Sequence, residues 1–138
     1  MRNYFTYSTI AALALLAGCQ TMSPQPKLAA DEPLPPPNPA YAGEMAKFNA
    51  QFPNDKAMKY EDISINYNNN LKLDEKGNCH SLSIHPVIVV LQLDAQGKVT
   101  NTTADVKNAK ADCFRQLYAS AQFPPPPFAP YRKPIKLK

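Results

Sequence analysis

The prolines of this chain limit where a folded domain can lie. Of its 138 residues, 15 are proline, and most of them cluster before Tyr41 or after Phe123. Proline lacks a backbone N–H, so it interrupts helices and is kept out of central strands. We therefore expect one small domain of about 98 residues, from Tyr41 to Lys138, a size at which a covalent cross-link adds useful stability.

The first 18 residues have the layout of a signal peptide. Arg2 is the single positive charge, and an apolar stretch runs from Tyr4 to Leu16. This stretch has the length of a signal-peptide apolar region and is short for a membrane span. We expect residues 1–18 to be removed on export; the alternative is an uncleaved signal anchor.

The residues that follow this apolar stretch are Leu16-Ala17-Gly18-Cys19. They resemble the bacterial lipobox, a branched apolar residue and two small residues before a cysteine. The resemblance implies that Cys19 is lipidated and becomes the first residue of the mature chain. Several acyl chains anchor a protein firmly to a membrane. Since Gln20 follows, the enterobacterial sorting rule implies the periplasmic face of the outer membrane, with the inner membrane as the alternative.

Residues 19–40 are rich in proline and show no apolar periodicity. This composition is typical of an extended polyproline spacer, which would span about 60 Å at roughly 3.1 Å per residue. We expect it to separate the domain from the membrane. A polyproline ligand for a partner protein is the alternative.

Apolar side chains then recur at the spacing of one helix face. Tyr41, Met45, Phe48 and Phe52 predict a helix that ends before Pro53. The segment from Pro53 to Gly77 is polar, and two short alternating runs within it predict strand fragments, the first at Ile63, Ile65 and Tyr67 and the second at Leu71 and Leu73.

The clearest strand runs from Ser81 to Asp94. Its second half places Val87, Val89, Leu91 and Leu93 on one face. The residues Asp94-Ala95-Gln96-Gly97 predict a hairpin turn, which would lead into a partner strand over residues 98–106.

A second helix and a last strand complete the expected domain. Asn108 can cap a helix over residues 109–122, which packs against the strand Val87 to Leu93, and a short strand follows at residues 135–138. We expect an α+β fold, a three-stranded, mainly antiparallel sheet with two helices on one face.

Four sequence features resemble the periplasmic C-terminal domain of TolA and, more distantly, that of TonB. They are Tyr41-Ala42-Gly43 before a helix, Cys79 before a strand with the turn Asp94–Gly97, Cys113 on a helix that runs into Phe123-Pro124-Pro125-Pro126, and a closing strand that ends at Lys138. The resemblance spans residues 41–138 and implies a domain that binds a protein partner. TolA and TonB also carry a membrane helix that couples them to motor proteins; this sequence shows no such helix, so energy transduction is not expected.

Cys79 and Cys113 remain once Cys19 carries lipid. An even pair in an exported domain indicates one disulfide, and the resemblance implies a bond from the start of a strand to the second helix. In the chain-entropy model, a disulfide that closes this loop stabilises the folded domain by about 4 kcal/mol. Two free or metal-binding thiols are the alternative.

Other chemistry finds little support in the residues. His80 and His85 lack the further convergent ligands of a metal site, and the acidic pairs Glu61-Asp62 and Asp74-Glu75 fall in segments predicted to be polar turns. The net charge of +4 is small and its cations are dispersed, apart from Arg132, Lys133, Lys136 and Lys138 near the C-terminus. We expect no enzyme, metal, cofactor, small-molecule substrate or nucleic acid.

The sequence therefore predicts a lipid-anchored adaptor of the cell envelope that serves envelope integrity or outer-membrane protein traffic. A partner could add a strand to the sheet at Val99–Val106 or at Ile135–Leu137, and the sequence does not distinguish these edges. The alternative is a structural component of an export, pilus or conjugation machine.

Overall fold

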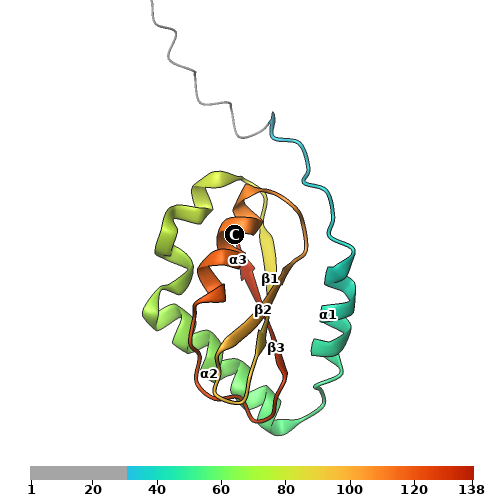
Figure 1. Ribbon diagram of the computed structural model, residues 1–138, viewed down its shortest axis with the longest axis vertical. Helices are drawn as coiled ribbons and strands as arrows, with labels where there is room; N and C mark the ends of the chain where they lie inside the picture. Colours follow the sequence, from blue (N-terminus) through green and yellow to red (C-terminus); the bar gives the residue numbers. More distant parts are fainter. Residues whose placement is uncertain (1–30) are drawn as a thin grey trace, which may run out of the picture.

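The computed structural model describes residues 31–138, so the predicted signal peptide and Cys19 lie outside the described residues. Figure 1 shows the order of the elements along the chain. They are α1 (Ala40–Asn49), α2 (Asp55–Leu71), the 3-10 segment η2 (Leu73–Leu82), β1 (Val87–Leu93), β2 (Val99–Ala104), α3 (Ala109–Ala119) and β3 (Tyr131–Leu137).

The central strand β1 organises the sheet. It pairs antiparallel with both neighbours, which gives the strand order β2-β1-β3. The side chains of Val87, Val89, Leu91 and Leu93 are completely buried on one face of this strand. The α+β class and the three-stranded antiparallel sheet are confirmed.

The hairpin between β1 and β2 has the predicted turn. The Asp94 carboxylate accepts hydrogen bonds from the backbone N–H groups of Gln96 and Lys98. Gly97 has a φ of +83°, and a Cβ atom there would lie 2.2 Å from the carbonyl oxygen of Phe123. Glycine is therefore required both by the turn and by the close passage of the chain after α3.

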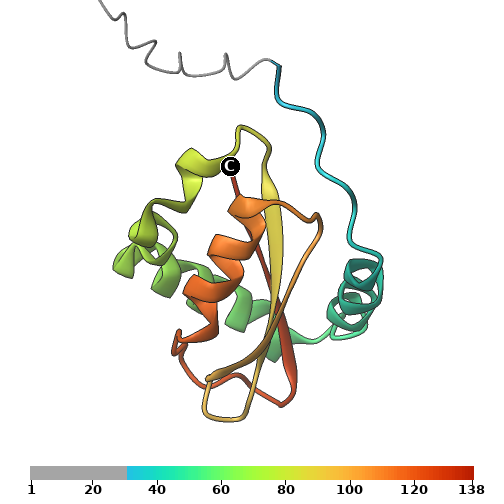
Figure 2. The same ribbon diagram turned by 45° about the horizontal axis from the view of Figure 1, so that its top comes forward.

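The helices lie on both faces of the sheet. In Figure 2, α1 lies on one side of the sheet and α3 on the other. Phe114 and Tyr118 of α3 join the core with Tyr60 of α2, so α2 and α3 share a face. Two helices on one face were expected, but the helix next to α3 is α2 and not the first helix. That first helix, α1, buries no side chain completely.

Helix α2 corrects the strands predicted between Pro53 and Gly77. Asn54 caps it by accepting hydrogen bonds from the N–H groups of Lys56 and Ala57. The buried side chains of α2 have helical spacing; they are Ala57, Tyr60, Ser64 and Asn68. Two of these four are polar, so the buried face carries only a weak apolar signal. The alternation at Ile63, Ile65 and Tyr67 is incidental, and Ile63 is 43% exposed.

The proline-rich segment joins the domain before Tyr41. Glu32 accepts hydrogen bonds from the Ser83 hydroxyl at 2.5 Å and the Ile84 N–H at 2.9 Å. The backbone of residues 36–38 then bonds to residues 105–107, where Pro37 forms a β-bridge with Val106. We call residues 32–39 the N-terminal strap. Because the strap is attached to the domain, residues 20–31 are the part of the sequence that separates Cys19 from the domain.

The charge of Glu32 makes the strap contact depend on pH. The hydrogen bond from Ser83, followed by that from the Ile84 N–H, holds the pKa of Glu32 below its ordinary value of 4.5. Because the pKa of Glu32 is lowered, its ionised carboxylate stabilises the strap contact at pH values above the ordinary pKa. The contact weakens as the pH falls through the lowered pKa, because the carboxylate then becomes protonated.

We predict that the Ile84 amide is protected from hydrogen exchange at neutral pH and loses that protection in acid, after correction for the intrinsic exchange rate. A Glu32→Gln variant should show weaker protection at neutral pH and little change with pH. The Leu91 amide, in the middle of β1, serves as the internal control. Equal protection of Ile84 in both proteins would show that Glu32 does not attach the strap.

Candidate functional site

The outer edge of β2 is occupied by the protein's own chain. The Asn38 side-chain amide donates to the Ala104 carbonyl at 2.8 Å, and Arg115 Nε donates to the Thr102 carbonyl at 3.3 Å. At the other end of the strand, the Val99 N–H donates to the Ala121 carbonyl at 3.4 Å. An incoming strand would have to displace all three contacts, so β2 is a poor acceptor.

The first half of the β3 edge is also covered. The side-chain amide of Gln51 accepts from the Arg132 N–H at 2.6 Å and donates to the Arg132 carbonyl at 3.0 Å. One glutamine thus makes both bonds that a neighbouring strand would make. The Arg132 side chain is held as well, because Nε donates to Glu44 at 2.9 Å.

The second half of the β3 edge is open. Backbone groups alternate in direction along a strand, so those of Lys136 point outward as those of Arg132 do. Pro134 lies between them and offers an outward carbonyl without an N–H. Within residues 31–138, no hydrogen bond from outside the sheet reaches Pro134 or Lys136. Beyond them, His80 Nδ1 lies 2.7 Å from the backbone oxygen of Lys138.

The predicted cluster of C-terminal cations is divided by the structure. Arg132 and Lys133 are buried and paired: Arg132 with Glu44, and Lys133 with Glu61 at 2.5 Å. Lys136 and Lys138 are exposed beside the open half of β3. This half-edge therefore combines free backbone groups with positive charge.

Cys79 and Cys113 are joined by a disulfide, with their Cα atoms 5.6 Å apart. Cys79 is the one buried side chain of η2, and its partner lies on α3. The bond therefore attaches η2 to the helix that packs on the sheet. Cys19, the third candidate residue, lies outside the described residues, and its lipidation stays a prediction.

Both histidines have structural contacts. His85 Nε2 lies 3.1 Å from the backbone oxygen of Glu32, and His80 contacts Asp74 and Lys138. Among the residues that the structure describes, no three histidine, cysteine or acidic side chains form a potential metal site.

Glu61 and Asp62 lie on α2 and not in the polar turn that was predicted. The Glu61 carboxylate accepts from Lys133 and from the Tyr131 hydroxyl at 2.8 Å. Burial, and next this hydrogen bond to Glu61, raise the pKa of Tyr131, so its hydroxyl stays protonated as a donor. This group of three joins α2 to β3 across the core.

Comparisons with protein-family models, curated proteins and solved structures found no match. The resemblance to TolA and TonB therefore stays a prediction from the sequence features. Within residues 31–138, no helix has both the length and the apolar character needed to cross a bilayer.

Loss of the disulfide should destabilise the domain. Cys79 and Cys113 are 34 residues apart, a loop for which the chain-entropy model gives about 4 kcal/mol. A variant with both Cys79→Ala and Cys113→Ala should lose about that free energy of unfolding in urea. Reduced wild-type protein should unfold at nearly the same urea concentration as the variant. A variant as stable as the oxidised wild type would contradict this role.

Proposed function

We propose that this chain is a lipid-anchored adaptor of the bacterial cell envelope that binds a protein partner and has no enzymatic activity. The observation that carries the proposal is the Cys79–Cys113 disulfide, because such bonds persist in oxidising compartments outside the cytoplasm. The segment Leu16–Cys19 supplies a route to that compartment. Gln20 favours the periplasmic face of the outer membrane over the inner membrane.

The open half of β3 supports strand addition as the mode of binding. An extended partner segment would bond to the Lys136 N–H and to the carbonyls of Pro134 and Lys136. Lys136 and Lys138 favour acidic side chains on that segment, since opposite charges at an exposed edge promote encounter. The few free backbone groups indicate a weak contact that a larger interface would reinforce.

Lipidation is tested on the chain itself. Growth with labelled palmitate should label the wild-type protein, and the mature chain should begin at Cys19. A Cys19→Ala variant should remain unlabelled and keep its leader, because the acylated cysteine is the site of processing. Wild-type protein that begins at Met1 or carries no fatty acid would refute the proposed anchor and compartment.

The binding edge is tested by removing one N–H group. Lys136→Pro deletes the outward N–H and should weaken partner binding about tenfold, as loss of a hydrogen bond and of strand alignment would. The sheet should remain folded, since edge strands accept proline and β3 already contains Pro134 in the same orientation. Lys136→Ala is the matched control, because it removes the charge and keeps the N–H. Equal binding by Lys136→Pro and Lys136→Ala would exclude this edge.

The partner is identified by photo-crosslinking in intact cells, with a photoreactive residue at position 136. A photoreactive residue at Asn101, on the covered β2 strand, is the control. We expect crosslinks to an envelope protein from position 136 and few from position 101. Crosslinks only to components of an export, pilus or conjugation machine would favour the structural role over the adaptor.

A further inference from the structure

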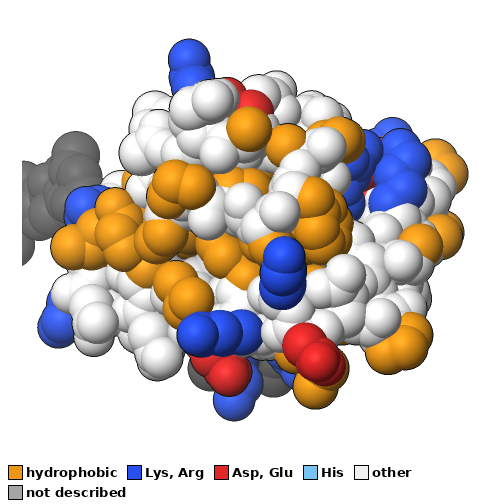
Figure 3. Space-filling model, turned by 90° about the horizontal axis from the view of Figure 1, so that it is seen from below, with side chains coloured by type: hydrophobic (Ala, Val, Ile, Leu, Met, Phe, Trp, Pro, Cys, Tyr) orange, Lys and Arg blue, Asp and Glu red, His pale blue; other side chains and the backbone are white. Residues whose placement is uncertain are grey.

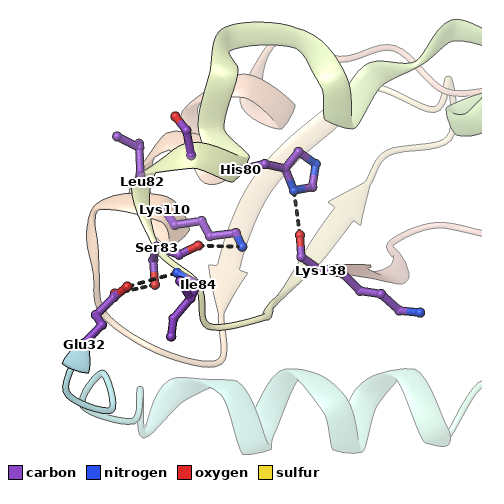
Figure 4. Close-up of a pocket in the computed structure, with 8 residues that line it drawn as sticks. Glu32, His80, Leu82, Ser83, Ile84, Lys110 and Lys138 are labelled. Carbon is purple, nitrogen blue, oxygen red and sulfur yellow. Dashed lines mark hydrogen bonds between the residues drawn. The ribbon is translucent and has the colours of Figure 1, made fainter. Parts of the chain in front are cut away.

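Three large apolar side chains are exposed at the end of the domain where the strap begins. Leu34 is 84% exposed, Leu82 is 49% exposed and Ile84 is 48% exposed. The Glu32 carboxylate accepts a hydrogen bond from the Ile84 N–H, and Leu34 follows Glu32 by two residues, so Leu34 and Ile84 lie at the same end of the domain. Figure 4 shows Ile84 near Glu32 and Leu82 farther along the same segment, which leads from η2 into β1.

Leu82 and Ile84 border a shallow hollow of about 530 Å³ whose lining also includes Glu32, Lys110 and Lys138. The Lys110 ammonium is buried and donates to the carbonyls of Ser83 at 3.1 Å and His85 at 3.0 Å. It therefore fixes the backbone on both sides of Ile84. Lys138 is exposed at the rim. The surface thus combines exposed apolar side chains with one carboxylate, Glu32, and one exposed cation, Lys138.

The same end lies closest along the chain to the proposed lipid anchor. Thirteen residue steps separate Cys19 from Glu32, which can span at most about 45 Å. Because Glu32 is attached beside Ile84, this short tether starts at the apolar end and not at the opposite end of the domain. A short tether gives a high effective concentration of the domain at the bilayer, so weak apolar contacts suffice for docking.

We propose that the domain rests on the bilayer that carries Cys19, with Leu34, Leu82 and Ile84 in the interface between headgroups and acyl chains and Lys138 at the headgroup phosphates. This proposal rests on the lipid anchor of the proposed function. In this arrangement the domain has a fixed orientation at the membrane surface, whereas a domain held only by its linker would have none. The open half of β3 leads into Lys138 and therefore lies next to the bilayer in this orientation, so a partner would reach Pro134 and Lys136 from the side of the sheet while Lys138 contacts lipid.

The opposite end of the domain offers a matched control surface. Figure 3 shows apolar side chains there as well. Met58, in the first turns of α2, is 56% exposed, and Phe128 is 36% exposed. Both lie away from the strap, so the tether gives them no preferred access to the bilayer.

The experiment uses the fact that the chain contains no tryptophan. Mature lipidated protein is reconstituted in vesicles of phosphatidylethanolamine and phosphatidylglycerol, with or without brominated acyl chains. Single tryptophans are introduced as Leu82→Trp, Ile84→Trp and, as the control, Met58→Trp. We expect brominated lipid to quench the fluorescence at positions 82 and 84 about twofold and to leave position 58 nearly unquenched. Vesicle flotation of the same samples reports the anchor independently.

Each outcome separates docking from anchoring. Quenching at positions 82 and 84 alone supports the proposal. Vesicles that float with the protein but give no quenching at these positions would overturn docking and leave the anchor intact. Equal quenching at positions 58 and 84 would show a bound domain without the proposed orientation. Protein that fails to float would refute the anchor, and the docking proposal with it.

Discussion

The packing of β1 is the constraint on which the rest of the structure depends. This strand forms both ladders of the sheet, and one face carries four completely buried aliphatic side chains, from Val87 to Leu93. Phe114 and Tyr118 of α3 and Tyr60 of α2 pack into the same cluster. Because a one-residue shift of β1 would turn its aliphatic side chains to the opposite face, the hydrophobic pattern also sets the register with β2 and β3.

The small core is reinforced at places where apolar packing is thin. The disulfide attaches η2, which buries little besides Cys79, and the Glu61–Lys133 pair joins α2 to β3. Removal of one member of such a pair leaves a buried charge, which is more damaging than replacement of both. Asn68 plays a similar part, because it accepts a hydrogen bond from the buried Tyr118 hydroxyl at 2.7 Å. These contacts bring together elements that are far apart in the sequence.

The sheet edges connect the fold with the proposed function. Exposed strand edges promote aggregation, and here several outward groups are bonded by side chains or by other segments. Asn38 and Arg115 protect β2, and Gln51 protects the start of β3. The short, cationic half-edge at Lys136 has no such hydrogen bond among residues 31–138. The selective exposure of one half-edge is consistent with a binding site that limits unspecific strand pairing.

The sequence by itself determined the elements whose signals are local. Alternation identified β1, Asp94 and Gly97 identified the hairpin turn, Asn108 identified the start of α3, and an even pair of cysteines indicated a disulfide. Only the tertiary structure decided that this segment is the helix α2, because its buried face includes Ser64 and Asn68. The Asn68 side chain is satisfied by the distant Tyr118 hydroxyl, whereas Ser64 donates to the Glu61 carbonyl of its own helix. The same holds for the strap, for the side of the sheet taken by α1 and for the open edge. Each depends on contacts between residues tens of positions apart, such as Gln51 with Arg132, and no local pattern encodes them.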